Sequence, residues 1–309
     1  MENLNQQADY PKYVDEYYDK STEREVLNEW VLENSSKMIV SDFSSGKYSI
    51  LDVGTPDGET NLKILSLIWR NLEPGTAVTY RVVNAQNSVM EQFKSLVESS
   101  KKREYKKMTF DWRVSTFSDY VNGKAGEAGN CKINLALFMQ SIYYEDAETA
   151  LANCYNNELE QNGVIVCVLQ DEANFMKRLQ SELSGKEYPT AGAMNNLTGK
   201  DIVAIAEKNG WKCEVHSPEY ILDVCECLKE DSEKGGLMLD KLFNVKDTRK
   251  NASPDVREQI VKFLEQESTA SGGSRILKEK LAIVIIYKWH EHETGNMQGY
   301  FVGLGWAAD

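Results

Sequence analysis

Three short runs of this chain are almost wholly apolar: residues 133–140 (INLALFMQ), 163–169 (GVIVCVL) and 281–287 (LAIVIIY). Such runs, with no polar alternation, are typical of strands buried on both faces, as in a parallel sheet covered by helices. Upstream, shorter strand-like segments alternate with segments of helical spacing, which favours βαβ units. The sequence therefore predicts an α/β fold with a twisted, mostly parallel, Rossmann-like sheet and helices on both faces.

The expected elements can be placed by residue number. Thr198 and Asp201 form a T-x-x-D capping signal before one helix, and Asn209-Gly210 is a helix stop. The stretch 268–274 (STASGGS) has the composition of a flexible loop, and the strand 281–287 is expected to run antiparallel. Expected strands are 48–53, 77–83, 108–113, 133–140, 163–169, 211–216, 220–228 and 281–287; expected helices are 59–72, 86–97, 146–160, 172–183, 195–209 and 256–266.

Net charge limits the partners. The chain has 309 residues and a formal net charge of −13. An acidic chain repels phosphate backbones and anionic lipid, so we expect no nucleic acid and no membrane partner. No segment has the length of an apolar membrane span, and no secretory signal is recognisable. We therefore expect a cytoplasmic protein, in monomeric form, that acts on a neutral or cationic small molecule.

No metal site is expected. Cys225 and Cys227 form C-x-C with no histidine nearby in sequence, and the six cysteines suit buried reduced thiols. His290 and His292 would share one face of a strand but lack a third ligand.

A strand-to-helix turn is the candidate binding feature. Residues 49–62 read SILDVGTPDGETNL, so Gly54 and Gly58 bracket a polar turn that follows Asp52. In open parallel sheets, ligands bind beyond the carboxyl ends of the strands. The spacing is not G-x-G-x-x-G, and the chain contains no P-loop. The turn suits S-adenosylmethionine, but an ordinary tight corner would look the same.

Five further segments match one family in order and spacing. They are KYVDEYYDKSTEREVLNEW (12–30), ILDVGTPDGETNLKIL (50–65), FDWRVSTFSDY (110–120), LFMQSIYYEDAETAL (137–151) and LKEKLAIVIIY (277–287). Over some 270 residues the chain resembles the histamine N-methyltransferase family. The resemblance implies a class I methyltransferase fold with a seven-stranded sheet and S-adenosylmethionine as cofactor. It also implies five parts: an N-terminal helical lid (1–46), a cofactor-binding core (47–170), a substrate-covering region (171–275), the last strand (276–293) and a tail (294–309).

The resemblance also implies roles for individual residues. Glu23 would hold the acceptor amine and is the expected catalytic residue; Gln140 would border both ligands. The remaining cofactor contacts would be Asp52, Gly54, Gly58, Asn84, Thr116 and Met139, and the remaining acceptor contacts Tyr13, Tyr17, Tyr143, Tyr144 and Glu279.

Four positions depart from the family pattern. Thr55-Pro56-Asp57 replaces a glycine-rich turn, and Asn84 stands where an acidic residue contacts the ribose. If Asn84 faces the ribose, an Asp there would bind the cofactor more tightly, because a carboxylate accepts charge-assisted hydrogen bonds. Phe117 replaces a serine, and Glu279 replaces an asparagine that binds the acceptor.

The expected function is S-adenosylmethionine-dependent N-methylation of a small amine, histamine-like or another biogenic amine. Two alternatives stay open: a methyltransferase fold with altered chemistry, and a non-catalytic binding protein with a weakened cofactor site. Individual residues have plainer explanations as well. Glu23 could be a solvated or capping residue, the tyrosines could be packing residues, and Glu279 could lie on a solvated strand edge.

Overall fold

The computed structural model describes residues 4, 7, 9–39, 46–55, 58–123, 132–188 and 197–288. Pro56, Asp57, the two histidines at 290 and 292, and the tail from 294 lie outside the described residues. A single sheet runs through the molecule in the order β3-β2-β1-β4-β5-β9-β6, with β7 and β8 also paired to β9. The strands are β1 (Lys47–Val53), β2 (Ala77–Asn84), β3 (Thr109–Val114), β4 (Ile133–Met139), β5 (Leu159–Gln170), β6 (Lys212–His216), β7 (Glu219–Asp223), β8 (Thr269–Ser271) and β9 (Ser274–Tyr287).

The prediction of a mostly parallel sheet with an antiparallel last strand is confirmed. Neighbouring strands among β1 to β5 pair in parallel, and β9 lies antiparallel between β5 and β6. The almost wholly apolar runs are the central strands β4, β5 and β9, where helices cover both faces. Alternate residues of β1 enter different cores: Ile50 faces one side, and Leu51 and Val53 face the other.

The predicted number of seven strands was wrong, because the described residues alone form a sheet of nine strands. β9 has 14 residues, and its first half extends beyond the parallel sheet to pair with β7 and β8. The expected flexible loop 268–274 is instead a hairpin, in which Gly272 and Gly273 both have positive φ (56° and 89°). Two consecutive glycines with positive φ form the tight turn that suits the twist of paired strands.

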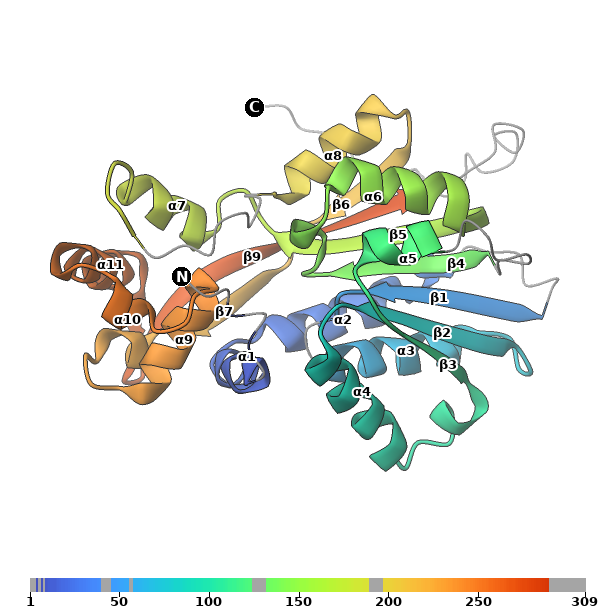
Figure 1. Ribbon diagram of the computed structural model, residues 1–309, viewed down its shortest axis with the longest axis horizontal. Coiled ribbons are helices and arrows are strands. Elements are labelled where there is room, and N and C mark those ends of the chain that lie inside the picture. The colour runs from blue at the N-terminus through green and yellow to red at the C-terminus, as the bar shows by residue number, and fades with distance from the viewer. Residues whose placement is uncertain are drawn as a thin grey trace.

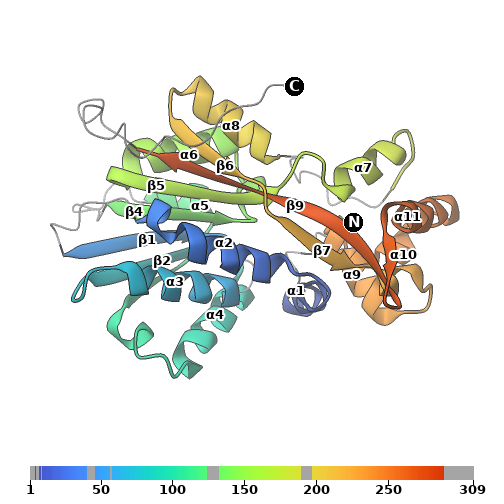
Figure 2. The same ribbon diagram turned by 180° about the vertical axis from the view of Figure 1, so that it is seen from behind.

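Helices cover both faces of the parallel part (Figures 1 and 2). One face packs against α2 (Glu23–Met38), α3 (Glu59–Asn71) and α4 (Asn87–Ser99). The other packs against α5 (Phe117–Gly123), α6 (Ala147–Asn153) and α8 (Gly199–Lys208). The predicted start of α8 is confirmed, since the Thr198 N–H donates to Asp201 Oδ2 (2.7 Å). The expected helix 146–160 is shorter, because α6 passes into a π-helical turn, η6 (Cys154–Glu158).

A third group of helices gathers around β7 and the first half of β9, at one end of the long axis (Figure 1). We call it the end cluster. Its core joins Tyr17 to apolar residues of the other helices, β7 and β9. The end cluster consists of α1 (Tyr10–Asp19), α7 (Phe175–Glu182), η7 (Cys225–Leu228), α9 (Glu233–Phe243), α10 (Thr248–Asn251) and α11 (Pro254–Glu267). Two further short 3₁₀ turns are η3 (Tyr105–Lys107) and η5 (Ile142–Tyr144).

The strand β7 fixes the entry to α2. The Thr22 N–H donates to the Ile221 carbonyl (3.0 Å), and the Ile221 N–H donates back to Thr22 Oγ1 (3.0 Å). The Asp223 N–H donates to the Lys20 carbonyl (2.8 Å). The segment 20–22 therefore pairs with β7 and places Glu23, the first residue of α2.

Arg249 holds the loop that precedes α9. Its guanidinium donates at 2.6 to 3.4 Å to five main-chain carbonyls, those of Glu226, Cys227, Lys229, Glu230 and Ser232. A rigid planar cation with several donors suits a cluster of carbonyls that the chain cannot satisfy internally.

Replacing Arg249 by Met should lower the free energy of unfolding by about 3 kcal/mol, because several carbonyls lose a charged donor. Urea unfolding followed by circular dichroism measures this. The control is Lys250→Met one residue along, where the Lys side chain is 80% exposed and forms an ion pair with Asp247. That change should cost less than about 0.5 kcal/mol. Equal effects of the two variants would contradict the anchoring role of Arg249.

Candidate functional site

A cavity of about 960 Å³ lies between the carboxyl ends of the parallel strands and the end cluster. Its volume is in the range of small-molecule sites. The sheet contributes residues that follow β1, β2, β3 and β4, among them Gly54, Asn84, Thr116 and Gln140. The end cluster contributes residues of α1, α7 and α9. One wall of the cavity therefore comes from the sheet, where a cofactor is expected, and the other wall comes from the end cluster.

Close packing, as well as access for a ligand, explains the two glycines in the turn between β1 and α3. Gly54 has a φ of 70° and lines the cavity. A Cβ atom on Gly54 would lie 2.6 Å from Ser141 Cβ, and Ser141 Oγ donates to the Val53 carbonyl. Gly58 lies against a ring, since its Cβ would be 2.5 Å from Phe93 Cγ. Both glycines are required by close contacts, and Gly58 is not among the residues that line the cavity.

Asp52 acts beneath the turn rather than in the cavity. Its side chain is fully buried, and Oδ2 accepts hydrogen bonds from the Tyr80 hydroxyl (2.6 Å) and Asn61 Nδ2 (2.7 Å). The Thr55 hydroxyl donates in turn to Asn61 Oδ1 (2.7 Å). Asp52 thus positions Thr55 through Asn61. Met139 is likewise 4% exposed and belongs to the core, so these two expected cofactor contacts lie outside the cavity wall.

The side-chain amide of Asn84 joins the turn after β1 to the turn after β2 by hydrogen bonds. Its Nδ2 donates to the Thr55 carbonyl (2.8 Å), and its Oδ1 accepts from the Gln86 N–H (2.8 Å). The amide orientation is unambiguous, because one partner is a carbonyl and the other an N–H. The expectation that an Asp here would strengthen the site is therefore reversed: a carboxylate could not donate to Thr55.

Gln86 lies next to these hydrogen bonds and lines the cavity. Its Oε1 is buried and accepts no hydrogen bond from any residue that the structure describes. A buried acceptor without a donor is costly unless a ligand or water completes it. Thr116 also lines the cavity, and its Oγ1 caps α5 by accepting from the Asp119 N–H (3.0 Å).

Six polar residues of the cavity wall form a ring of contacts, which we call the Glu23 ring. The Tyr17 hydroxyl donates to Glu23 Oε2 (2.8 Å), and Gln140 Nε2 donates to Glu23 Oε1 (3.1 Å). The hydroxyl oxygens of Tyr17 and Tyr220 lie 3.4 Å apart. The ring closes through Tyr220 to Gln170 Oε1 (3.0 Å), the Gln170 N–H to the Tyr143 hydroxyl (2.7 Å), and Tyr143 to Gln140 Oε1 (2.9 Å). All six residues line the cavity.

Backbone geometry directs Gln140 into this ring. Its φ is 53°, in the left-handed region that non-glycine residues seldom adopt. The Gln140 N–H donates to the Val168 carbonyl (2.9 Å), which extends the pairing with β5 by one residue beyond β4. Unusual backbone conformations of this kind gather at functional sites, where the surrounding contacts hold them in place.

Glu23 is 3% exposed. Burial raises the pKa of its carboxyl above the ordinary value, while the hydrogen bonds from Tyr17 and Gln140 and the charges of Lys241 and Arg24 oppose the rise. Burial also raises the pKa of the Tyr17 and Tyr220 hydroxyls, so both remain protonated donors. A carboxylate offers about four lone-pair positions, of which the ring uses two. The others are available to a ligand.

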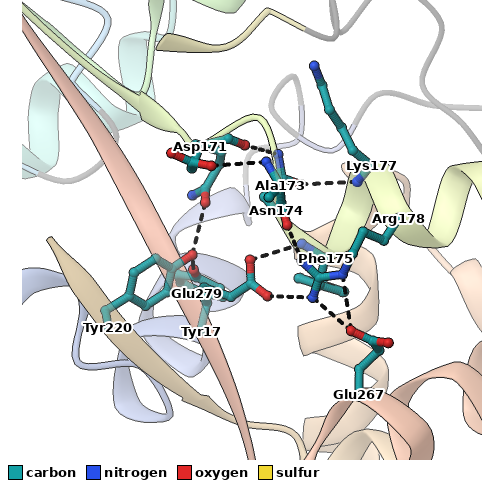
Figure 3. A network of polar contacts seen from close by, with 11 residues as sticks. Tyr17, Asp171, Ala173, Asn174, Phe175, Lys177, Arg178, Tyr220, Glu267 and Glu279 are labelled. Atoms are coloured by element: carbon teal, nitrogen blue, oxygen red, sulfur yellow. Dashed lines mark hydrogen bonds and ion pairs between the residues drawn. The ribbon is translucent and has the colours of Figure 1, made fainter. Parts of the chain in front are cut away.

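Two expected acceptor contacts lie elsewhere. Tyr13 is 2% exposed and packs with Leu4, Tyr10, Val14 and Val89, so it supports the wall from behind. Glu279 borders a separate small pocket, and Figure 3 shows it between Phe175 and Arg178. Neither Tyr13 nor Glu279 therefore lies on the wall of the main cavity, where the acceptor contacts were expected.

Glu279 instead holds the start of α7. It accepts from the Phe175 N–H (2.9 Å) and from Arg178 (3.2 Å). Burial raises the pKa of its carboxyl, and these two partners oppose the rise. A carboxylate at a helix N-terminus is favourable. Since Phe175 lines the main cavity, Glu279 acts on the site through the position of α7. Tyr144 lines the cavity as expected and is 43% exposed.

The sequence did not reveal several lining residues. Gln170 ends β5, and the rule that ligands bind beyond strand carboxyl ends could have found it. Gln86 is two residues after β2 and follows the same rule. No sequence signal marks Tyr220 and Lys241 as lining residues, because the positions of β7 and α9 in the fold bring them to the cavity.

The described residues contain no cluster of three or more His, Cys, Asp or Glu side chains that could hold a metal ion. No described helix is long and apolar enough to cross a membrane.

Asn84→Asp should destabilise the protein by about 1–3 kcal/mol, because a carboxylate would face the Thr55 carbonyl without a proton to donate. Thermal unfolding at neutral pH measures this. Asn209→Asp is the matched control, since Asn209 Nδ2 also donates to a main-chain carbonyl (2.9 Å) but in an exposed position where water can replace it. A stable Asn84→Asp protein with tighter binding of S-adenosylhomocysteine would show that residue 84 faces a ligand.

Comparison with known proteins gives one group of curated relatives and a set of structures with a similar fold. No protein-family model matches the chain. Histamine N-methyltransferase B of Xenopus laevis is 23% identical over 286 residues, covering 90% of this chain and 96% of the relative. Histamine N-methyltransferase of Bos taurus is 24% identical over the same length, with the same coverage.

Among solved structures, a protein of Bacillus halodurans classed as a methyltransferase aligns with a TM-score of 0.50 and 8% identity. The alignment covers 84% of this chain and 99% of the other. At this identity the likeness concerns the fold alone. The chain has the class I methyltransferase fold, and its resemblance to histamine N-methyltransferases along most of its length is confirmed.

Proposed function

We propose that this protein is an S-adenosylmethionine-dependent N-methyltransferase that acts on a small amine. The observation that supports this most directly is the buried Glu23 ring, which opens into the same cavity as the Gly54 turn. The Glu23 carboxylate attracts a protonated amine. A cofactor bound against the Gly54 turn would lie next to that amine. The similarity to histamine N-methyltransferases over 90% of the chain supports the same chemistry.

The residues of the sheet wall fit the cofactor. The volume of about 960 Å³ is large enough for two small ligands. Gln86 lines the cavity two residues after the end of β2, a position that suits a ribose hydroxyl. Gly54 brings the backbone to the cavity wall, and Ser115 and Thr116 add hydroxyl groups after β3. When bound, the cofactor supplies an activated methyl group on a sulfonium.

The other wall fits the acceptor. Glu23 holds the amine, and Gln140, Tyr17 and Tyr143 fix the carboxylate so that its position does not depend on the ligand. An amine can react only when its nitrogen has a free lone pair. Because burial raises the pKa of Glu23, this carboxylate holds a proton more readily than an exposed one. Positioning and exclusion of water then account for most of the rate enhancement.

A second candidate is a binding protein on the same scaffold without catalysis. The observation that favours it is Asn84, whose amide is fully used by Thr55 and Gln86, so the ribose lacks the charge-assisted contact of an acidic residue. The two candidates differ in their need for the cofactor.

Calorimetric titration with S-adenosylhomocysteine should give one site of micromolar affinity, which corresponds to about 8 kcal/mol. Gln86→Ala should weaken this affinity several-fold, by about 1 kcal/mol, because it removes one hydrogen-bond acceptor. Gln92→Ala is the control, since Gln92 lies on α4, just after Gln86, and its Oε1 is also buried without a hydrogen-bond donor among the described residues, but it lies outside the cavity. No binding at millimolar ligand would favour the second candidate over the enzyme.

Glu23→Gln should lower kcat/KM for amine acceptors at least tenfold and leave S-adenosylhomocysteine affinity nearly unchanged. Glu25→Gln, on the exposed side of the same helix, is the control. Equal loss of cofactor affinity and acceptor use would contradict the assigned role.

The stability of the Glu23→Gln variant shows whether it has folded correctly. A carboxyl group with a raised folded pKa contributes stability below its unfolded pKa, near 4.5, and that contribution is lost as pH rises through the folded pKa. The variant has no carboxyl to titrate but leaves one ring donor without an acceptor, so its melting temperature should change less than that of the wild type as the pH rises from about 4.5 to 7.

A further inference from the structure

The charged residues that line the cavity are two carboxylates and two ammonium groups: Glu23, Glu145, Lys177 and Lys241. The chain as a whole has a net charge of −13, so a cavity of balanced charge is not what its composition predicts. Glu145 lies near α5, where it accepts from the Phe117 N–H (3.3 Å). The positive charge of Lys177 helps to lower the pKa of Asp201, so the Lys177 ammonium interacts with the start of α8.

Lys241 is the cation beside the Glu23 ring. It lies on α9, is half-buried, and its Nζ is 5.5 Å from the centre of the Tyr10 ring and 6.0 Å from that of Tyr17. The hydroxyl of this same Tyr17 donates to Glu23. Lys241 forms no ion pair with any residue in the part of the chain that the structure describes. Two aromatic faces therefore hold an ammonium that acts on Glu23 from a distance without forming an ion pair among the described residues.

This arrangement disfavours an acceptor whose only charge is a protonated amine. Such a cation would gain the attraction of Glu23 but meet the repulsion of Lys241 in a site of reduced dielectric. A molecule with both an amine and an anionic group would place the amine at Glu23 and the anion at Lys241, and each charge would meet its opposite.

We propose, on the basis of the function proposed above, that the acceptor is an amine that also bears an anionic group, a carboxylate in the simplest case. Glu23 binds its amine and Lys241 binds its carboxylate. The cofactor also has a carboxylate, on its methionine part, and the experiment separates that source from the acceptor.

The test is calorimetry on protein saturated with S-adenosylhomocysteine, titrated with pairs that differ by one carboxylate. Suitable pairs are histamine and histidine, tyramine and tyrosine, and putrescine and ornithine. In at least one pair the wild type should bind the carboxylate-bearing member about tenfold more tightly. Lys241→Met should abolish that preference, and so should Lys241→Gln, which preserves a polar end if the Met variant folds poorly. Lys234→Met is the matched control, because Lys234 lies on the same helix with its side chain 59% exposed.

Three results would overturn the proposal. The first is tighter binding of the decarboxylated member in every pair, or no binding of any carboxylate-bearing member at 10 mM, roughly the weak limit of measurable affinity. The second is retention of a carboxylate preference in both Lys241 variants. The third is that these variants bind S-adenosylhomocysteine more weakly but 5′-methylthioadenosine, which lacks the carboxylate, as well as before; Lys241 would then serve the cofactor. Failure of the wild type to bind S-adenosylhomocysteine would instead contradict the proposed function, so the two failures are distinguishable.

Discussion

The burial of the Glu23 carboxylate is the constraint on which the arrangement of the site depends. A charged group that is 3% exposed destabilises a protein unless its oxygens accept hydrogen bonds. Tyr17 and Gln140 provide them, and each of these donors lies against a further member of the ring. The ring draws on α1, α2, β7 and the carboxyl ends of β4 and β5. Stabilising one charge thus joins the end cluster to the parallel sheet, and the wall they form is fixed before any ligand binds.

The length of β9 makes this union possible. Within the main sheet, β9 pairs with β5 as far as Leu281, which lies opposite Gln170 at the end of β5. The residues of β9 that precede Leu281 extend beyond β5 and pair with β7. The strand β7 in turn pairs with the segment before Glu23. One strand therefore contributes both to the core of the methyltransferase fold and to the base of the end cluster.

The sequence could predict the sheet because burial on both faces leaves a local signal, as in 163–169 and 281–287. It could not predict the hairpin at 268–274, since serine and glycine are equally common in loops and in tight turns. The resemblance pointed to Glu23, Gln140 and the tyrosines after β4, all of which line the cavity. Glu279 instead borders a separate pocket, which the resemblance could not show, because matching by position cannot say to which side of a strand a side chain points. Tyr220 and Lys241 were beyond its reach because their place depends on long-range packing.

The two walls of the cavity differ in how they can discriminate ligands. On the sheet side the amide of Asn84 is used by the main chain, so recognition relies on neutral groups such as Gln86 Oε1 and on backbone contact at Gly54. Neutral hydrogen bonds in a cavity of fixed shape distinguish ligands by size and shape more than by charge. On the acceptor side the recognising groups are charged and partly desolvated, so a mismatch leaves a buried charge without a partner, which is more costly than a missing neutral bond. If the proposed acceptor is correct, selectivity among amines should depend chiefly on the charges around Tyr17, where Glu23 and Lys241 would act on one ligand from two sides.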